Sequence, residues 1–446
     1  QIMEQAAREC GIALVSYTIT HHTRQSAVGL PFIQEKQYDG KTVSVTEYTM
    51  SEIIAAVYDK MEATGIREGI LFIDEINCVS ETLAPTMLQF LQCKTFGNQK
   101  VPEGWVIVAA GNPPEYNRSV REFDVVTLDR IKRIDVEENY EVWKEYAYQA
   151  DIHPAILAYL EIRKECFYRI ETTVDGKAFV TARGWEDLSW LLKAYEVLGK
   201  RVDQEVVHQY IQHWKTAKDF AGYLELYAKY QKDYGFERIL EGNYGKETLD
   251  KLKYAQFDER LSVVSLLTGQ LNGRFRFWTE KDRYVTLLYG YLKKYKETSD
   301  LEKTEEDAQK AYETLRRGEL LTKEDDRIWQ QVLERIRKYR LLCQSEHLKG
   351  KEAFERVRQE FQEETEALEK VTDQTLEALN HGFIFMEDAF GDSQEMTVFV
   401  TELNTNEASV RFLKENDCDL YYRYNKKLLP GEQQQEILDE LDGLLS

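Results

Sequence analysis

A short, wholly apolar run that ends in two adjacent carboxylates, at residues 69–75, constrains the fold of this chain more than any other feature. The run reads Gly-Ile-Leu-Phe-Ile-Asp-Glu, and its length is typical of a strand buried on both faces of a parallel sheet. Ligands of open α/β sheets bind beyond the carboxyl ends of the strands, where Asp74 and Glu75 emerge. The run therefore predicts an acidic site at a sheet edge, and a solvated acidic turn is the alternative interpretation.

A second buried-strand pattern, Val106 to Ala110, ends in Gly111 and a polar Asn112. Two prolines follow at once and bar continuation of the strand. An asparagine at a strand end beside a carboxylate strand can hydrogen-bond both an attacking water and a terminal phosphate oxygen. The two strand ends together predict phosphoryl transfer to water, in which one carboxylate holds Mg²⁺ and its neighbour orients the water. We assign Asp74 to the first role and Glu75 to the second.

A basic cluster, Thr-Leu-Asp-Arg-Ile-Lys-Arg, follows a loop at residues 127–133. An arginine in such a position can reach the nucleotide of a neighbouring subunit and neutralise the charge that develops there. Arg130 is the first candidate for this role. Arg133 is the weaker one, because the alternation Arg-Ile-Asp-Val predicts a strand at 133–136.

With these elements on one chain, the sequence resembles the AAA+ ATPases, and within them the MoxR-like branch related to the dynein group. The resemblance covers roughly residues 1–200. Its matching segments are Leu71–Ile76 for the Walker B motif, Ala109–Pro113 for sensor 1, Leu128–Ile131 for the arginine finger and Val180–Ser189 for sensor 2. The resemblance implies ATP and Mg²⁺ as ligands, with Arg130 as the finger and Arg183 as the lid arginine that contacts the nucleotide.

The same resemblance implies a homo-oligomeric ring, expected to be a hexamer, that remodels or loads a protein client in the cytoplasm. A partner with a von Willebrand factor A domain is a further family expectation. Two other function classes stay open: a non-catalytic AAA+-like scaffold and a DNA-directed AAA+ motor. DNA-stimulated turnover with a steep salt dependence would distinguish the motor from a protein-remodelling ATPase.

One element of the family is missing from these residues. The phosphate-binding loop, Gly-x-x-x-x-Gly-Lys-Ser/Thr, does not occur in the sequence, and this loop supplies most of the phosphate grip. The chain opens with an amphipathic helix pattern that ends at Gly11, and in the family this helix begins inside the loop. We therefore expect a parallel-sheet P-loop-type core that lacks its first strand and Walker A loop by truncation, and a loop-free pseudo-ATPase is the rival interpretation.

Composition narrows the function classes. The formal net charge is −21, with 79 acidic against 58 basic residues, which disfavours broad affinity for nucleic acid or anionic membranes. The six cysteines are scattered without a Cys-x-x-Cys pair and indicate free thiols of a reducing compartment. No apolar stretch is long enough to cross a bilayer.

The α/β core is expected at residues 1–139. Besides the strands at 70–73, 106–110 and 133–136, it contains a strand at 12–18 and a hairpin at 32–49 around Asp39-Gly40, a typical two-residue turn. The hairpin stands before or within a helix at 50–64. A second helix is expected at 79–93 with Ser80 as its cap. Phe96, in the turn that follows, either contacts a client or packs the turn.

The helical lid is expected at residues 140–200, with Thr181 capping a helix over 182–198 that carries Arg183 in its first turn. Residues 201–446 predict a mostly helical partner- or subunit-contact region, with a compact C-terminal subdomain at about 381–446. The helices expected in this region are 204–234, 248–272, 280–298, 305–316, 323–344 and 351–380. Their apolar stripes are typical of core packing.

Overall fold

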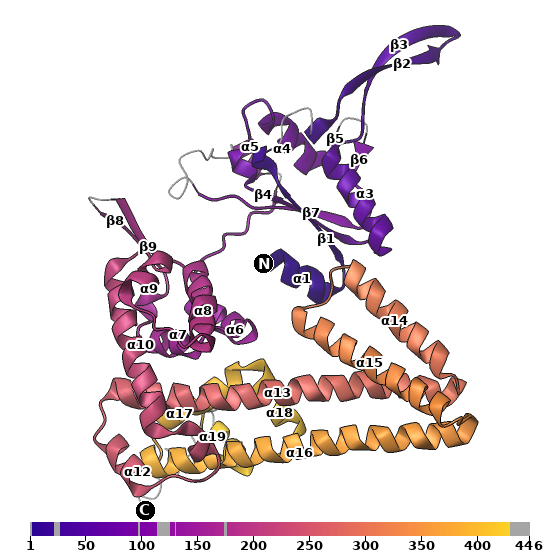
Figure 1. The fold of residues 1–446 in the computed structure, drawn as a ribbon. Coiled ribbons are helices and arrows are strands. Elements are labelled where there is room, and N and C mark those ends of the chain that lie inside the picture. Colours follow the sequence, from indigo (N-terminus) through magenta and orange to yellow (C-terminus); the bar gives the residue numbers. More distant parts are fainter. Residues whose placement is uncertain are drawn as a thin grey trace, which may run out of the picture. The chain divides into compact units, whose positions relative to one another are not determined.

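The computed structural model describes residues 2–21, 27–96, 99–113, 125–129, 131–173 and 176–428. The chain divides into two compact units, each made of two separate segments of the sequence. Figure 1 shows the fold, coloured along the sequence. The first unit contains Gln1–Val136 and Gly290–Gly350, and the second contains Glu137–Tyr289 and Lys351–Ser446. The predicted class is confirmed at this level: a small parallel sheet lies in the N-terminal region, and a long helical region follows it.

The sheet of the first unit has the strand order β1 (Ala13–Thr18), β4 (Gly69–Asp74) and β7 (Trp105–Ala109), and both pairs are parallel. β4 lies in the middle, and Leu71 and Ile73 are fully buried. They share a core with apolar side chains of α3 (Glu52–Thr64). Gly69 is required at the start of β4, because a Cβ there would lie 2.7 Å from the Ala13 carbonyl oxygen and from the Trp105 ring.

The prediction of a strand at residues 133–136 is wrong. Residues 131–139 are described and contain no strand. Ile134 and Val136, the apolar half of the alternating pattern, are 73% and 78% exposed. No described strand lies next to β7 on the side away from β4, so the alternation has no sheet to join.

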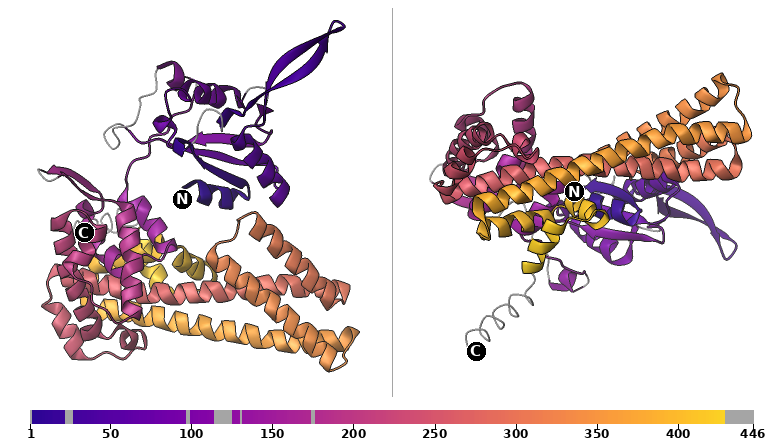
Figure 2. Two further views of the ribbon diagram at one scale, coloured as in Figure 1. Left: turned by 45° about the horizontal axis from the view of Figure 1, so that its top comes forward. Right: turned by 90° about the horizontal axis from the view of Figure 1, so that it is seen from below.

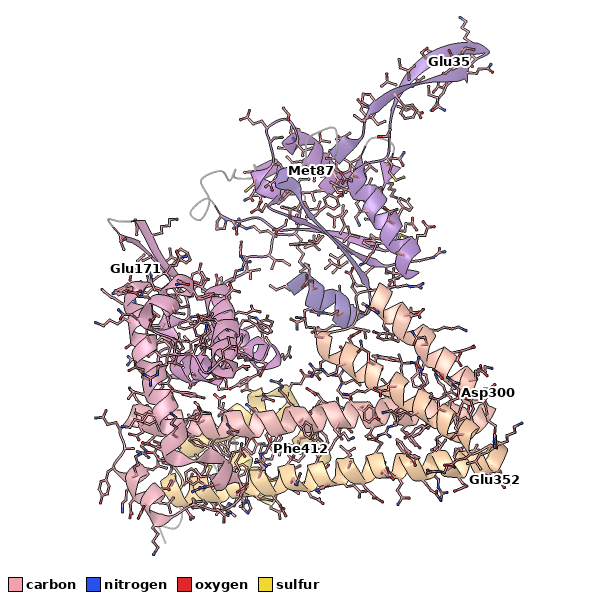
Figure 3. All side chains as sticks on the ribbon, viewed as in Figure 1. Glu35, Met87, Glu171, Asp300, Glu352 and Phe412 are labelled. Atoms are coloured by element: carbon pink, nitrogen blue, oxygen red, sulfur yellow. The ribbon has the colours of Figure 1, made fainter. Side chains whose placement is uncertain are left out.

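The hairpin predicted around Asp39-Gly40 is confirmed. β2 (Pro31–Tyr38) and β3 (Lys41–Tyr48) pair antiparallel across a two-residue turn in which both residues have positive φ. The hairpin precedes α3 and extends away from the sheet, with Glu35 near its end (Figures 1 and 3). Its apolar side chains include the exposed Ile33 and Val43.

The helix predicted over 79–93 is shorter in the structure. α4 (Ala84–Cys93) begins after a turn. The Ser80 carbonyl oxygen accepts backbone hydrogen bonds in this turn, and the Ser80 side chain does not cap the helix. Met87 of α4 lies in the core of the first unit (Figure 3). The next turn contains β5 (Thr95–Phe96) and β6 (Gln99–Lys100). Phe96 is 1% exposed and stacks on Phe90 at 4.0 Å between ring centroids, so of its two expected roles it has the packing role.

The other described elements before the second unit are short or lie at the N-terminus. They are α1 (Ile2–Cys10), η1 (Ile19–His21), η2 (Ile76–Cys78) and α5 (Val125–Leu128). In the Gly290–Gly350 segment, α14 (Leu301–Arg317) and α15 (Lys323–Ser345) pack on each other. Thr322 caps α15 through a reciprocal capping box with Asp325. The apolar stripe predicted for this helix is buried at Ile328, Val332, Ile336 and Tyr339.

The second unit begins with helices that surround a shared apolar core. A β-hairpin that the sequence analysis missed lies among them, although Asp-Gly at 175–176 was a signal for it. The helix expected at 204–234 is broken, because His213 starts a new helix by accepting a hydrogen bond from the Thr216 backbone N–H. These elements are α6 (Tyr140–Gln149), α7 (Pro154–Ile162), η3 (Lys164–Cys166), β8 (Arg169–Thr173), β9 (Gly176–Val180), α8 (Ala182–Val197), α9 (Gln204–Tyr210) and α10 (Trp214–Tyr234).

Two long helices organise the rest of the second unit. α13 (Phe257–Thr298) is continuous where two helices were expected, and α16 (Gly350–Phe390) is longer than predicted. They run alongside each other (Figures 1 and 2), and Trp278 Nε1 donates a hydrogen bond to Thr372 Oγ1 at 2.9 Å. Phe412 packs edge-on against Trp278 (Figure 3). The shorter helices are α11 (Phe236–Leu240), α12 (Lys246–Lys253), α17 (Gln394–Thr405), α18 (Glu407–Glu415) and α19 (Asp419–Lys427).

No helix in the part of the chain that the structure describes has the length and apolar character needed to span a membrane.

Candidate functional site at the carboxyl edge of the sheet

The ends of β4 and β7 stay hydrogen-bonded to each other beyond the last paired residues. The Ala110 backbone N–H donates to the Ile73 carbonyl oxygen at 2.9 Å, and the Ile76 N–H donates to the Ala110 carbonyl oxygen at 2.9 Å. The turn that carries Asp74 and Glu75 and the segment that carries Asn112 therefore leave the same edge of the sheet. The structure brings these three predicted site residues together.

The backbone turns sharply at Glu75, directly after the strand. Glu75 has φ 56° and ψ 36°, in the left-handed region, which costs a residue with a side chain about 1 kcal/mol. Asp74 stabilises this turn, because its Oδ1 accepts a hydrogen bond from the Glu75 N–H at 2.9 Å. Glu75 in turn accepts a bond from the Cys78 N–H at 2.8 Å through its carbonyl oxygen. The second carboxylate thus leaves the strand direction at the point where a ligand would bind.

Neither carboxylate of this edge forms an ion pair with a described residue. Asp74 and Glu75 are half-buried, and among the described residues no lysine, arginine or histidine forms an ion pair with either. Burial, and then the charge of the nearby Glu75, raises the pKa of the Cys78 thiol. Carboxylates held together without a counter-charge are typical of a site that binds a cation or an incoming ligand.

The donor set fits Mg²⁺ bound together with a nucleotide. Magnesium keeps several waters and takes one or two protein carboxylates plus phosphate oxygens, rather than a cage of protein ligands. No cluster of three or more His, Cys, Asp or Glu side chains able to hold a metal occurs in the described ranges. Asp74 and Glu75 are therefore suited to a metal that a phosphate ligand brings with it.

The third strand also ends at this edge. Thr18 of β1 is the Cα partner of Asp74, so β1 stops level with the first carboxylate. Tyr17, one residue earlier, is half-buried, and burial together with the neighbouring Glu52 raises its pKa to about 12. The phenol therefore stays protonated at neutral pH, and Tyr17 adds no charge to the edge.

The sequence analysis missed Asn77, which connects the two turns. Its Nδ2 donates a hydrogen bond to the Asn112 carbonyl oxygen at 2.7 Å. Its Oδ1 is buried and has no hydrogen-bond partner among the described residues. The sequence signal was a lone amide in the otherwise apolar turn Ile76-Asn-Cys-Val that follows the acidic pair.

The two arginines proposed for the neighbouring subunit's nucleotide have different outcomes. Arg130 lies outside the described residues. Arg133 is described and exposed, and its guanidinium Nε donates to Asp135 Oδ1 at 2.7 Å. The structure therefore gives Arg133 a local partner within its own segment.

Arg183 belongs to the second unit, on the first turn of α8. The predicted cap is confirmed, because Thr181 Oγ1 accepts a hydrogen bond from the Gly184 N–H at 3.2 Å. Arg183 is exposed and forms no ion pair with Glu186, Asp187 or any other described residue. A surface ion pair with Glu186 or Asp187 was the alternative to a role in nucleotide binding.

The other residues of the predicted sensor 2 motif have packing roles. A Cβ on Gly184 would lie 2.7 Å from the Tyr210 carbonyl oxygen, so α8 needs glycine to pack against the end of α9. Trp185 is fully buried, and its Nε1 donates to the Phe167 carbonyl oxygen at 3.1 Å. Packing thus accounts for Gly184 and Trp185, while Arg183 has no hydrogen bond or ion pair with a described residue.

The second unit contains a different group of charges, the Lys144 triad, made of Lys144, Glu161 and Glu402. Lys144 is 5% exposed, and its Nζ lies 2.7 Å from Glu161 and also bonds Glu402 of α17. Burial raises the pKa of Glu402 despite the nearby lysine. Burial also acts to raise the pKa of Glu161, but Lys144 outweighs it and lowers that pKa overall.

The two carboxylates of the triad also line a cavity of about 100 Å³, together with Asp151, Asn272 and Arg276. Each acid in its wall already has a basic partner, since Asp151 pairs with both Lys193 and Arg276. The cavity therefore presents balanced charges, in contrast to the sheet edge.

Comparison of the chain with models of known protein families, with curated protein sequences and with solved structures gave no match. The AAA+ resemblance therefore stays a prediction, and the function is inferred from the geometry of the sheet edge.

Proposed function

We propose that this chain is an ATP-hydrolysing AAA+ ATPase of MoxR type that remodels or loads a protein client. The observation that carries the proposal is the common edge of β4 and β7, where Asp74, Glu75 and Asn112 meet and no described cation neutralises the carboxylates. An edge of this kind suits a phosphate ligand that arrives with its own metal.

Each residue has a separate role in this proposal. Asp74 would hold Mg²⁺, which supplies neutralisation of phosphate charge when it is bound with ATP. Glu75 orients the attacking water and draws away its proton as the water reacts. Asn112 donates a hydrogen bond through its side-chain amide to the terminal phosphate and positions the same water. The left-handed turn at Glu75 separates the two carboxylates so that they can serve these different roles.

The oligomeric part of the proposal depends on the arginines. Arg130 acts on the nucleotide of the neighbouring subunit, and Arg183 couples the lid to the nucleotide. The exposure of Arg183 and its lack of an ion pair with a described residue support a role toward a ligand. A finger that acts in trans requires a ring, for which a hexamer is expected, and a von Willebrand factor A domain protein is the expected partner.

The test is ATP hydrolysis by the full-length protein, compared with its Glu75→Gln variant. Removing a general base lowers turnover by about 10² to 10⁴-fold. Glu68→Gln is the matched control, because it makes the same change at the exposed start of β4 and is expected to keep full turnover. Equal rates for the wild type and Glu75→Gln would remove the role assigned to Glu75.

Two outcomes would support the alternative functions. ATP binding without hydrolysis in the wild type would favour the non-catalytic scaffold. Turnover that DNA stimulates, with a strong dependence on salt, would favour the DNA-directed motor.

A further inference from the structure

The Asn77 side chain joins the acidic turn to the asparagine turn. It follows Glu75 by two residues, within η2, and its Nδ2 bonds the Asn112 carbonyl oxygen at 2.7 Å. The backbone bond from the Ile76 N–H to the Ala110 carbonyl oxygen lies beside it. Two backbone bonds, from the Ala110 N–H to Ile73 and from the Ile76 N–H to Ala110, and the one side-chain bond of Asn77 thus connect the segments that carry Glu75 and Asn112.

Gly111 shows how closely the Asn77 amide packs on the second turn. A Cβ on Gly111 would lie 2.5 Å from Asn77 Oδ1 and 2.7 Å from its Cγ, distances that real Cβ atoms do not adopt. The other atoms nearest to that Cβ position all belong to Asn77, and Gly111 does not have a positive φ. The Asn77 side chain is therefore what excludes a larger residue at position 111.

The Asn77 amide also carries a cost that a purely structural residue would avoid. Its Oδ1 is buried without a partner among the described residues, and a buried acceptor left unpaired is unfavourable. An apolar side chain would fill the same space without this penalty. Such a group is more readily explained by a positional requirement at a functional site than by stability.

We infer that Asn77 is a positioning residue that holds Asn112 against the turn of Asp74 and Glu75, through its bond to the Asn112 carbonyl oxygen and its contact with Gly111. This inference rests on the proposed ATP hydrolysis. Asn77 itself need not touch the nucleotide. It sets the distance between the group that orients the water and the group that binds the terminal phosphate, and small errors in such a distance have large effects on rate.

The experiment is a double-mutant cycle at positions 77 and 111 in the full-length protein, with kcat and KM for ATP as readouts. Asn77→Ala is expected to lower kcat by at least about tenfold while KM changes less than about threefold, because alignment is lost and nucleotide binding is kept. Asn77→Asp is expected to fail as a rescue, since a carboxylate cannot donate to the Asn112 carbonyl oxygen.

The second arm of the cycle tests the contact itself. Gly111→Ala alone is expected to lower kcat, because its Cβ displaces the Asn77 amide. In the Asn77→Ala background the same change is expected to cost less than about twofold more, because the obstructing side chain is gone. Independent, multiplying effects of the two substitutions would overturn the inference.

A variant destabilised elsewhere in the same core separates positioning from general loss of stability. Val57→Ala in α3 removes fully buried methyl groups and is expected to lower Tm while leaving kcat unchanged. If the wild type hydrolyses ATP no faster than Glu75→Gln, the proposed function is overturned, and the role of Asn77 with it. Wild-type hydrolysis that Asn77→Ala leaves unchanged would overturn the positioning role alone.

Discussion

The chain contains two pairs of carboxylates with opposite surroundings. Asp74 and Glu75 are half-buried at the end of a strand, on a strained turn, with no cation beside them among the described residues. Glu402 is buried and Glu161 is half-buried; they come from different helices and share Lys144. The residue types are alike, so the difference between the pairs lies in whether a described cation neutralises the carboxylates.

That difference separates a structural charge from a functional one. A buried carboxylate remains stable only with a partner, and the Lys144 triad joins α6, α7 and α17 by satisfying this need. At the sheet edge no described cation neutralises Asp74 or Glu75, so their charges stabilise no ion pair there and can interact with a ligand. The following predictions test this contrast in order of expected effect.

The largest effect is expected from Lys144→Met. Removing the lysine leaves Glu161 and Glu402 buried without their shared cation, which costs about 3–5 kcal/mol for a buried pair. Urea unfolding followed by circular dichroism measures this loss. Lys164→Met is the matched control, because it removes a half-exposed lysine that pairs with Glu141 and, at 3.5 Å, with Glu161, but leaves Lys144 in place. Its loss is expected to cost less than about 1 kcal/mol. Similar losses for both lysines would break the contrast.

Smaller effects of opposite sign with pH are expected at the two carboxylates of the triad. Lys144 lowers the pKa of Glu161, so its contribution to stability is present above the usual carboxyl pKa and is lost as the pH falls. Burial raises the pKa of Glu402, so its contribution is present at low pH and is lost as the pH rises through the raised pKa. Glu161→Gln and Glu402→Gln should each remove one of these trends.

The measurement is the free energy of unfolding of the wild type and both variants at a series of pH values. Subtracting each variant's curve from that of the wild type isolates one carboxyl group. Two difference curves that slope in the same direction would contradict the opposite environments of Glu161 and Glu402.

A gain of about 1 kcal/mol is expected from Glu75→Gly. Glycine adopts the left-handed conformation at Glu75 without the penalty of a side chain, and no described ion pair of Glu75 is lost. The expected result is a higher Tm together with loss of ATP hydrolysis. A lower Tm would show that the Glu75 side chain stabilises the fold.

The smallest effect is expected from Glu75→Gln, whose unfolding free energy should stay within about 0.5 kcal/mol of the wild type. The substitution keeps the size of the side chain and removes a charge that has no described partner. Chemical denaturation of both proteins measures it. A loss above about 2 kcal/mol would place Glu75 with the structural carboxylates.

The comparison of sequence and structure shows which elements local chemistry specifies. The Asp39-Gly40 turn and the Thr181 cap were predicted, and both depend on residues within a few positions of each other. The Thr322 capping box, equally local, was missed. The strand at 133–136 was wrong, because alternation indicates a strand only where a neighbouring strand exists. The break at His213 was missed, because an apolar stripe continues across it.

The sequence by itself determined that an apolar strand ends in two carboxylates, that a second strand ends in an asparagine, and where several turns and caps lie, since short-range sterics and hydrogen bonds govern these features. Only the tertiary structure decided that β4 and β7 are neighbours, that Asn77 bonds Asn112, and that Lys144 joins Glu161 to Glu402, 241 positions further along the chain. Such pairings arise from packing between distant segments, and a side chain's partner across that distance leaves no pattern in its local sequence.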